Sequence, residues 1–134
     1  MTSPHRVVNP SGLAAPRGYA HAVVAAPGRT VHLAGQVAGD EQGVIRGDSL
    51  AAQFDAAAGN VVTALSAAGG APEHIVSMTV YVTDVAAYRE ARPALRDVWR
   101  AHFGEHYPAM AVIGIASLVD PAALVEIVAT AVLP

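Results

Sequence analysis

The sequence predicts an α+β fold in which two helices pack on one face of a mixed β-sheet. Two amphipathic segments, over residues 48–68 and 84–104, have the apolar spacing that is typical of helices. Strand-like runs precede, separate and follow these two segments. With 134 residues, of which 53% are hydrophobic, the chain can bury a core, and residues 1–134 are expected to form one domain.

The first helix is expected to begin after Asp48 or Ser49, because either side chain can accept a hydrogen bond from a free N–H of the first turn. The Gly69-Gly70 pair is expected to end it, since glycine readily adopts the conformation that follows a helix. Between these ends, apolar residues repeat at helical spacing: Leu50, Phe54, Ala57, Val61, Leu65 and Ala68.

The second helix is expected to begin at Asp84 and to end near Gly104, with Pro93 kinking or dividing it. One side of this helix carries Tyr88, Leu95, Trp99 and His102. An arginine stripe, consisting of Arg89, Arg92, Arg96 and Arg100, is interpreted as a solvated face.

Runs of β-branched and other apolar residues predict the strands. A turn over 40–43 is expected to lead into a short extended piece at 44–45. The resulting order is ββ(β)αβαββ, with the third β in brackets for that short piece. The five longer predicted strands cover residues 20–26, 30–36, 74–83, 109–116 and 123–134.

Composition excludes several classes of protein. Cysteine is absent, which removes disulfides, thiol nucleophiles and thiolate metal sites. All eight basic residues are arginine, so no lysine is present to form a Schiff base. The net charge of −3 does not favour a nucleic-acid partner. The N-terminus has no apolar run of signal-peptide length, and no later segment has eighteen uninterrupted apolar residues, so a soluble, cytoplasmic protein without a membrane partner is expected.

Glu126 is the one charged residue of the closing run, "ALVEIVATAVLP". A carboxylate among apolar neighbours is costly unless it is paired, hydrated or used in chemistry. Both sides of this strand are apolar, but two helices of one chain can cover only one face of the sheet. We therefore expect a second copy of the protein to cover the other face, with Glu126 in or near the interface.

Six segments are distinctive when they are taken in order: "GYAHAV", "LAGQVA", "QFDAAAGNVVTALSAAGG", "VSMTVYVTD", "YPAMAVIGIASL" and "ALVEIVATAV". Together they resemble the blocks of the reactive intermediate deaminase (RidA/YjgF) family, also called endoribonuclease L-PSP. The resemblance extends from Tyr19 to Val132 and implies a chorismate-mutase-like fold, a homotrimer and small-molecule clefts between subunits. It also implies hydrolysis of imines and enamines derived from amino acids, such as 2-aminoacrylate, without a metal or an organic cofactor.

The resemblance assigns roles to three residues that match the family pattern. Glu126 falls at the acidic position suited to activating water. Tyr19 matches a tyrosine that lines the cleft, and Gly35 matches a glycine whose backbone N–H approaches the substrate. The alternatives are an interface ion pair for Glu126, plain packing for Tyr19 and a turn or bulge for Gly35.

Other positions depart from the family pattern. Ala34 replaces the usual serine before the glycine, and Val112 replaces a cysteine that many relatives have. Met110 stands where the deaminases have an arginine that can bind a substrate carboxylate through two parallel bonds. Arg92 lies close to a cleft position on the second helix and is a candidate for a replacement cation. The segment from Met110 to Glu126 is one residue longer than the family pattern.

The histidines have simpler interpretations than a metal site. His102 and His106 are four apart, but Gly104 lies between them and no third ligand is evident, so they are interpreted as cations at a helix C-terminus. His32 is interpreted as a structural histidine with satisfied hydrogen bonds.

Two functions therefore remain open. The first is a RidA-like imine or enamine hydrolase whose preference has shifted away from carboxylates like that of 2-aminoacrylate. The second is a trimeric small-molecule binder or pathway accessory protein that kept the cleft without deaminase activity. Retention of Glu126 favours the first function, and Met110 favours altered chemistry or none.

Overall fold

The computed structural model describes residues 2–134. A two-stranded ribbon and a four-stranded sheet accompany two long helices and a short 3₁₀ helix. In chain order the elements are β1 (Arg6–Val8), β2 (Ala22–Val24), β3 (Arg29–His32), α1 (Leu50–Ala67), the 3₁₀ helix η1 (Pro72–His74), β4 (Ile75–Val82), α2 (Val85–Phe103), β5 (Ala109–Gly114) and β6 (Val125–Leu133).

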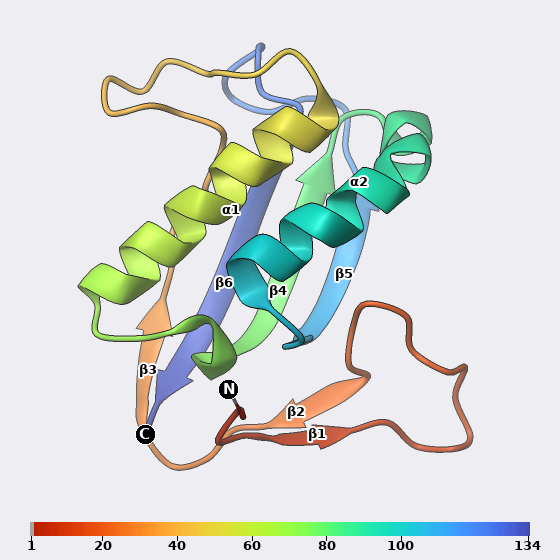
Figure 1. Cartoon of the computed structure of the whole chain (residues 1–134), viewed down its shortest axis with the longest axis vertical. Helices are drawn as coiled ribbons and strands as arrows, with labels where there is room; N and C mark the ends of the chain where they lie inside the picture. Colours follow the sequence, from red (N-terminus) through yellow and green to blue (C-terminus); the bar gives the residue numbers. More distant parts are fainter. Residues whose placement is uncertain (1) are drawn as a thin grey trace.

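The main sheet is mixed and has the strand order β3-β6-β4-β5. β6 is antiparallel to both of its neighbours, whereas β4 and β5 are parallel and are connected through α2. Both long helices lie on the same face of this sheet, and the opposite face has no helix over it (Figure 1). The predicted α+β class and the packing of the helices on one face are confirmed.

The core lies between the helices and this covered face. Alternate residues of β6 from Val125 to Leu133 point into it, as the period-two pattern of a strand requires. α1 buries one stripe that includes Phe54, Val61 and Leu65. Helix α1 begins where predicted, directly after Ser49, because the Ser49 hydroxyl accepts a hydrogen bond from the Ala52 N–H at 3.1 Å.

α2 begins and ends as predicted, with Asp84 as its N-cap and Gly104 as its C-cap. Pro93 was expected to kink or divide the helix, and the second alternative is wrong, since α2 is continuous from Val85 to Phe103. Pro93 is exposed, so water can solvate the Arg89 carbonyl that loses its helical partner. None of the helices in residues 2–134 has the length and sustained apolar character of a membrane crossing.

The N-terminal ribbon of β1 and β2 is a feature that the sequence did not predict in full. The expected strand at 20–26 is shorter, at 22–24, and it pairs with β1, which was not predicted. The chain just before β2 touches the main sheet, where Ala20 forms a bridge with Ala109 at the start of β5. The extended piece near 45 is a single bridge between Gly39 and Ile45.

His5 fastens this N-terminal segment to the rest of the fold. It is 7% exposed, and its Nδ1 accepts a hydrogen bond from the Ala26 N–H at 2.9 Å. Since Nδ1 is an acceptor, the proton lies on Nε2, which donates to the carbonyls of His74 and Val132, both at 3.1 Å. One neutral imidazole thus joins three separate segments.

The predictions for two other histidines are wrong. His106 was interpreted as a cation, but it is partly buried, and desolvation lowers its pKa from 6.5 although Nε2 bonds to the Ile75 carbonyl at 2.7 Å. His32 was interpreted as satisfied, but it is exposed, and its side chain forms no hydrogen bond within residues 2–134. His102 lies near the end of α2 and bonds to Asp55 of α1.

His106 should make the fold less stable in mild acid. Because its pKa is lower in the folded state, the unfolded chain binds more protons as pH falls below about 6.5. The free energy of unfolding should therefore be highest above that pH and should decrease through the window between the unfolded and folded pKa values. Urea titrations at several pH values measure this slope.

The matched comparison is between His106→Gln and His21→Gln. His21 lies on the exposed N-terminal segment, where its Nε2 bonds to the Ala14 carbonyl. His106→Gln should flatten the pH dependence, and His21→Gln should preserve it. An unchanged slope in His106→Gln would contradict the role assigned to this imidazole.

Candidate functional site

Glu126 lies near the start of β6, on the face of the sheet opposite the helices. Its neighbours Val125 and Ile127 are fully buried against the helices, so the alternation of the strand places the carboxylate on the open face. The side chain is half-buried. β6 begins at the end of the sheet where the loop after β3 and the loop after β5 both lie (Figure 1).

A β-bulge lies beside Glu126 on the neighbouring strand. The Leu33 N–H bonds to the Ala129 carbonyl, and Gln36 pairs with Ile127 through two backbone hydrogen bonds. Two residues, at positions 34 and 35, therefore stand opposite the single residue Val128. Such bulges interrupt the ladder and leave backbone groups available at functional sites.

Gly35, the second residue of this bulge, is in direct contact with Glu126. A Cβ atom at position 35 would lie 2.5 Å from Glu126 Oε2 and 2.8 Å from Cδ, so only glycine leaves the carboxylate in this position. Gly35 is exposed, and its N–H has no hydrogen-bond partner within the described chain. A carboxylate and a free backbone donor thus lie side by side.

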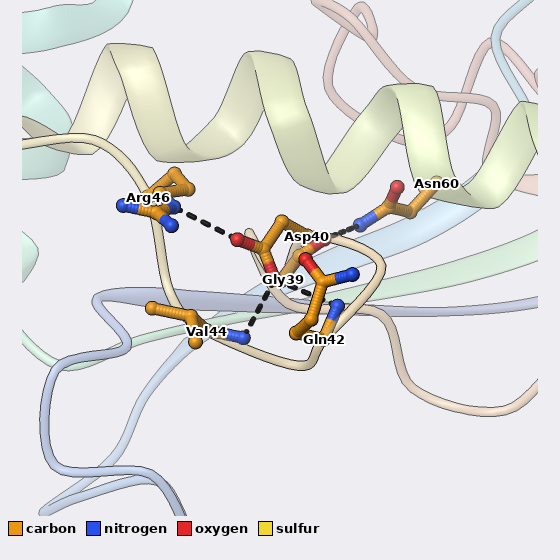
Figure 2. Close-up of polar contacts among 6 residues, drawn as sticks. All are labelled: Gly39, Asp40, Gln42, Val44, Arg46 and Asn60. Atoms are coloured by element: carbon orange, nitrogen blue, oxygen red, sulfur yellow. Dashed lines mark hydrogen bonds and ion pairs between the residues drawn. The ribbon is translucent and has the colours of Figure 1, made fainter.

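The loop that follows the bulge is held in place from both sides. Asn60 of α1 donates from Nδ2 to the Val37 carbonyl at 3.0 Å. It also donates to the Gly39 carbonyl at 2.9 Å (Figure 2). Hydrogen bonds from the Val44 N–H and from Arg46 hold the pKa of Asp40 below its usual value. These contacts fix the chain a few residues beyond Gly35 and thereby support the bulge.

Tyr81 of β4 is a site residue that sequence reasoning missed. It is the direct cross-strand partner of Glu126, and it shares the open face because Val80 and Val82 point into the core. The alternation of residues 75–82 was the signal that could have placed Tyr81 on the open face, but nothing else in the sequence distinguished it from the other residues of this strand.

Met110 and Val112 lie on the other face of the sheet from Glu126. They are in register with Met78 and Val80, which belong to the core, and Met110 packs against that core. Val112 remains 38% exposed because β5 is an edge strand. Within one chain, neither residue shares a site with Glu126.

Tyr19 and Arg92 also lie apart from Glu126. Tyr19 directly precedes Ala20, which forms a bridge with Ala109 at the start of β5. Measured along the strands, this position is about 13 Å from the level of Glu126 in the sheet. It borders a pocket of about 640 Å³ between the N-terminal segment and the connection from α2 to β5. Arg92 is exposed on α2, with its guanidinium 5.9 Å from the Tyr88 ring centre, and it forms no ion pair within residues 2–134.

The predicted residues therefore form two groups. One group, at the bulge, contains Glu126, Ala34 and Gly35. The other, around β5, contains Met110 and Val112, with Tyr19 near its first residue. In the described chain, no three residues of the His, Cys, Asp and Glu types come together in a way that could hold a metal ion.

Comparisons with known proteins decide the family. The family model described as Endoribonuclease L-PSP matches residues 10–133. The chain belongs to this family, which is that of the Rid and YjgF proteins. This confirms the resemblance noted in the sequence blocks. No match was found among curated proteins.

Solved structures from the family have the same fold. A protein of unknown function of the conserved Rid family, YyfB from Yersinia pestis, is 34% identical, with a TM-score of 0.86 over 96% of this chain and 98% of that one. A YjgF/YER057c/UK114 family member from Mycobacterium tuberculosis is 32% identical, with a TM-score of 0.65 over 87% of each chain. RidA from an Antarctic Psychrobacter is 30% identical, with a TM-score of 0.68 over 90% of this chain and 92% of that one.

Proposed function

We propose that this family member hydrolyses an imine or enamine, as a deaminase, in a cleft between two subunits of a homotrimer. The observation that carries this proposal is the Glu126 carboxylate in contact with Gly35, whose N–H has no hydrogen-bond partner within residues 2–134. The carboxylate can take a proton from water as the water attacks the imine carbon. The N–H can bind a polar group of the substrate and fix the position of that carbon.

The two separated groups of residues support a site that spans two copies. Glu126 and Gly35 lie on the open face, whereas Met110 lies on the covered face at the sheet edge. A second copy packed on the open face would bring one chain's edge strand toward the other chain's carboxylate. If three copies assemble in this way into the proposed homotrimer, light scattering should report three times the chain mass of 13.7 kDa. A particle of the monomer mass would contradict the assembly.

The proposed substrate does not rely on a carboxylate at the usual place. Met110 has a soft, apolar side chain that cannot form the paired charge-assisted bonds of an arginine. Uncharged or apolar imines should therefore be better substrates than 2-aminoacrylate. Arg92, which is free of ion pairs within residues 2–134, is the candidate for holding a carboxylate if a substrate carries one.

The second candidate function is a small-molecule binder or pathway accessory protein on the same scaffold, and Met110 is the observation that favours it. Measuring ammonia release from imines generated in situ from several amino acids separates the two. Release above the uncatalysed rate supports the hydrolase. Binding of the same imines or their keto products without any release would support the binder and would overturn the hydrolase.

Gly35→Ala should slow ammonia release by roughly tenfold, because the added methyl group must displace the Glu126 carboxylate. The free energy of unfolding should change little, since the displaced atoms are at the end of a flexible side chain. Gly12→Ala is the matched control, because a Cβ atom at Gly12 would meet nothing within 4 Å. Equal rates for native protein and Gly35→Ala would show that the position of the carboxylate does not limit turnover.

Met110→Arg should raise turnover of 2-aminoacrylate by roughly 10- to 150-fold, the equivalent of a hydrogen bond to a charged group worth about 1.5–3 kcal/mol. The same change should lower the thermal midpoint, because Met110 packs against the core and an empty site leaves the cation unpaired. Kinetics and thermal unfolding are measured together. Rapid turnover of 2-aminoacrylate by the native protein would contradict the idea that the arginine is needed.

A further inference from the structure

Tyr81 and Glu126 are directly opposite each other on adjacent antiparallel strands. Both side chains are half-buried on the open face of the sheet. The Cβ atoms of such a pair lie about 5 Å apart, so a substrate that contacts the Glu126 carboxylate is within reach of the Tyr81 hydroxyl.

No other ionisable side chain of the sheet lies level with Tyr81 and Glu126, in the row of residues that crosses the strands at this point. Across the strands the row continues to Ile113 of β5 and, on the other side, to the bulge at Gly35. The next ionisable group on the open face is His32, which is level with Thr130 and therefore about 13 Å further along β6. Among the side chains of the sheet, Tyr81 is thus the one next to Glu126 that can donate a proton.

Each of the two stages of imine hydrolysis removes a proton from oxygen and adds a proton to nitrogen, two atoms that are bonded to the same carbon. When water attacks the carbon, a C–O bond forms, the water loses a proton, and the C=N electron pair moves to nitrogen, which gains a proton. When the resulting carbinolamine collapses, the hydroxyl loses its proton, the C–N bond breaks, and the nitrogen needs a second proton to leave as ammonia or an amine. A single carboxylate would have to perform both roles in turn.

We propose that Tyr81 is the second catalytic residue of this site and donates the proton to the imine nitrogen while Glu126 accepts the proton from water. The protonated Glu126 then returns its proton to the Tyr81 phenolate, which restores both groups before the carbinolamine collapses. The same exchange repeats in the collapse step, so an imine and water yield a carbonyl compound and an amine with no proton gained or lost. This inference rests on the proposed hydrolase function.

The test is Tyr81→Phe, which removes only the hydroxyl group. On an imine that the native protein hydrolyses, kcat should fall about tenfold or more while KM and the thermal midpoint stay close to the native values. The loss should be larger for N-substituted imines whose leaving amine is more basic, since those need the proton most. A purely structural tyrosine would show no such dependence on the leaving group.

Tyr107→Phe is the matched control, because Tyr107 stacks on Trp99 with ring centres 5.9 Å apart and lies outside the strands that carry Glu126. It should retain native kinetics. If the native protein and Tyr81→Phe release ammonia equally fast, or if the loss is the same for every leaving amine, the role of Tyr81 is overturned while the proposed function stands. If the native protein releases none from any imine, both are overturned.

Discussion

Replacing Gln53 with alanine should lower the free energy of unfolding by about 2–4 kcal/mol, because three backbone groups would lose their partner. Gln53 is 2% exposed on α1, and its Nε2 donates to the carbonyls of Gly47 at 3.1 Å and Ala122 at 3.0 Å. Its Oε1 accepts from the Leu124 N–H at 2.8 Å. One amide therefore joins α1 to the loop before it and to the loop before β6.

Urea unfolding of Gln53→Ala and Gln42→Ala measures this effect. Gln42 is exposed. Its backbone N–H, which the substitution preserves, bonds to Asp40, and its side chain forms no hydrogen bond in the part of the chain that the structure describes. Gln42→Ala should change the free energy of unfolding by less than about 0.5 kcal/mol. If Gln53→Ala falls within the same limit, water must replace the amide at all three backbone groups.

The helices could be predicted because their signals are local. Ser49 and Asp84 cap the two helices with their own side chains, and the residues that end each helix follow directly in sequence. The covered face of β6 could be predicted for the same reason, since a strand alternates residue by residue. These features depend on residues that are close together in the sequence, and contacts between distant segments do not change them.

The N-terminal ribbon could not be predicted, because distant contacts decide it. β1 has only three residues, and it pairs with a strand more than a dozen positions away. His5 is buried by a turn, a 3₁₀ helix and the end of β6, none of which is near it in sequence. A lone histidine beside a proline carries no sign of these partners.

The candidate site was predicted in part. Glu126 stood out as a charge in an apolar strand, but its contact with Gly35 was not foreseen. The expected approach of the Gly35 N–H to a substrate stays a prediction. The pairing of Tyr81 with Glu126 depends on strand register, which neither sequence segment reveals alone. The same is true of Met110, whose face is set by its alignment with Met78 in a parallel pair.

Glu126→Gln should reduce ammonia release by about a hundredfold or more, because the amide cannot accept a proton from the attacking water. Glutamine has nearly the same shape, so the contact with Gly35 and the assembly state should be preserved. The rate is measured on the best imine found for the native protein, with light scattering and thermal unfolding on the same samples. A loss of activity with intact assembly separates the chemical role from a structural one.

Glu105→Gln is the matched control for this substitution. Glu105 is an exposed carboxylate, paired with Arg100 at 3.4 Å, and it lies outside the sheet that carries Glu126. Neutralising it should leave the rate unchanged, since exposed ion pairs contribute little and this one is remote from the bulge. Equal turnover by native protein and Glu126→Gln would instead assign Glu126 to an interface contact, because a general base cannot be removed without cost. A dissociated Glu126→Gln protein would lead to the same assignment by a different observation, since the carboxylate would then be needed to hold the copies together.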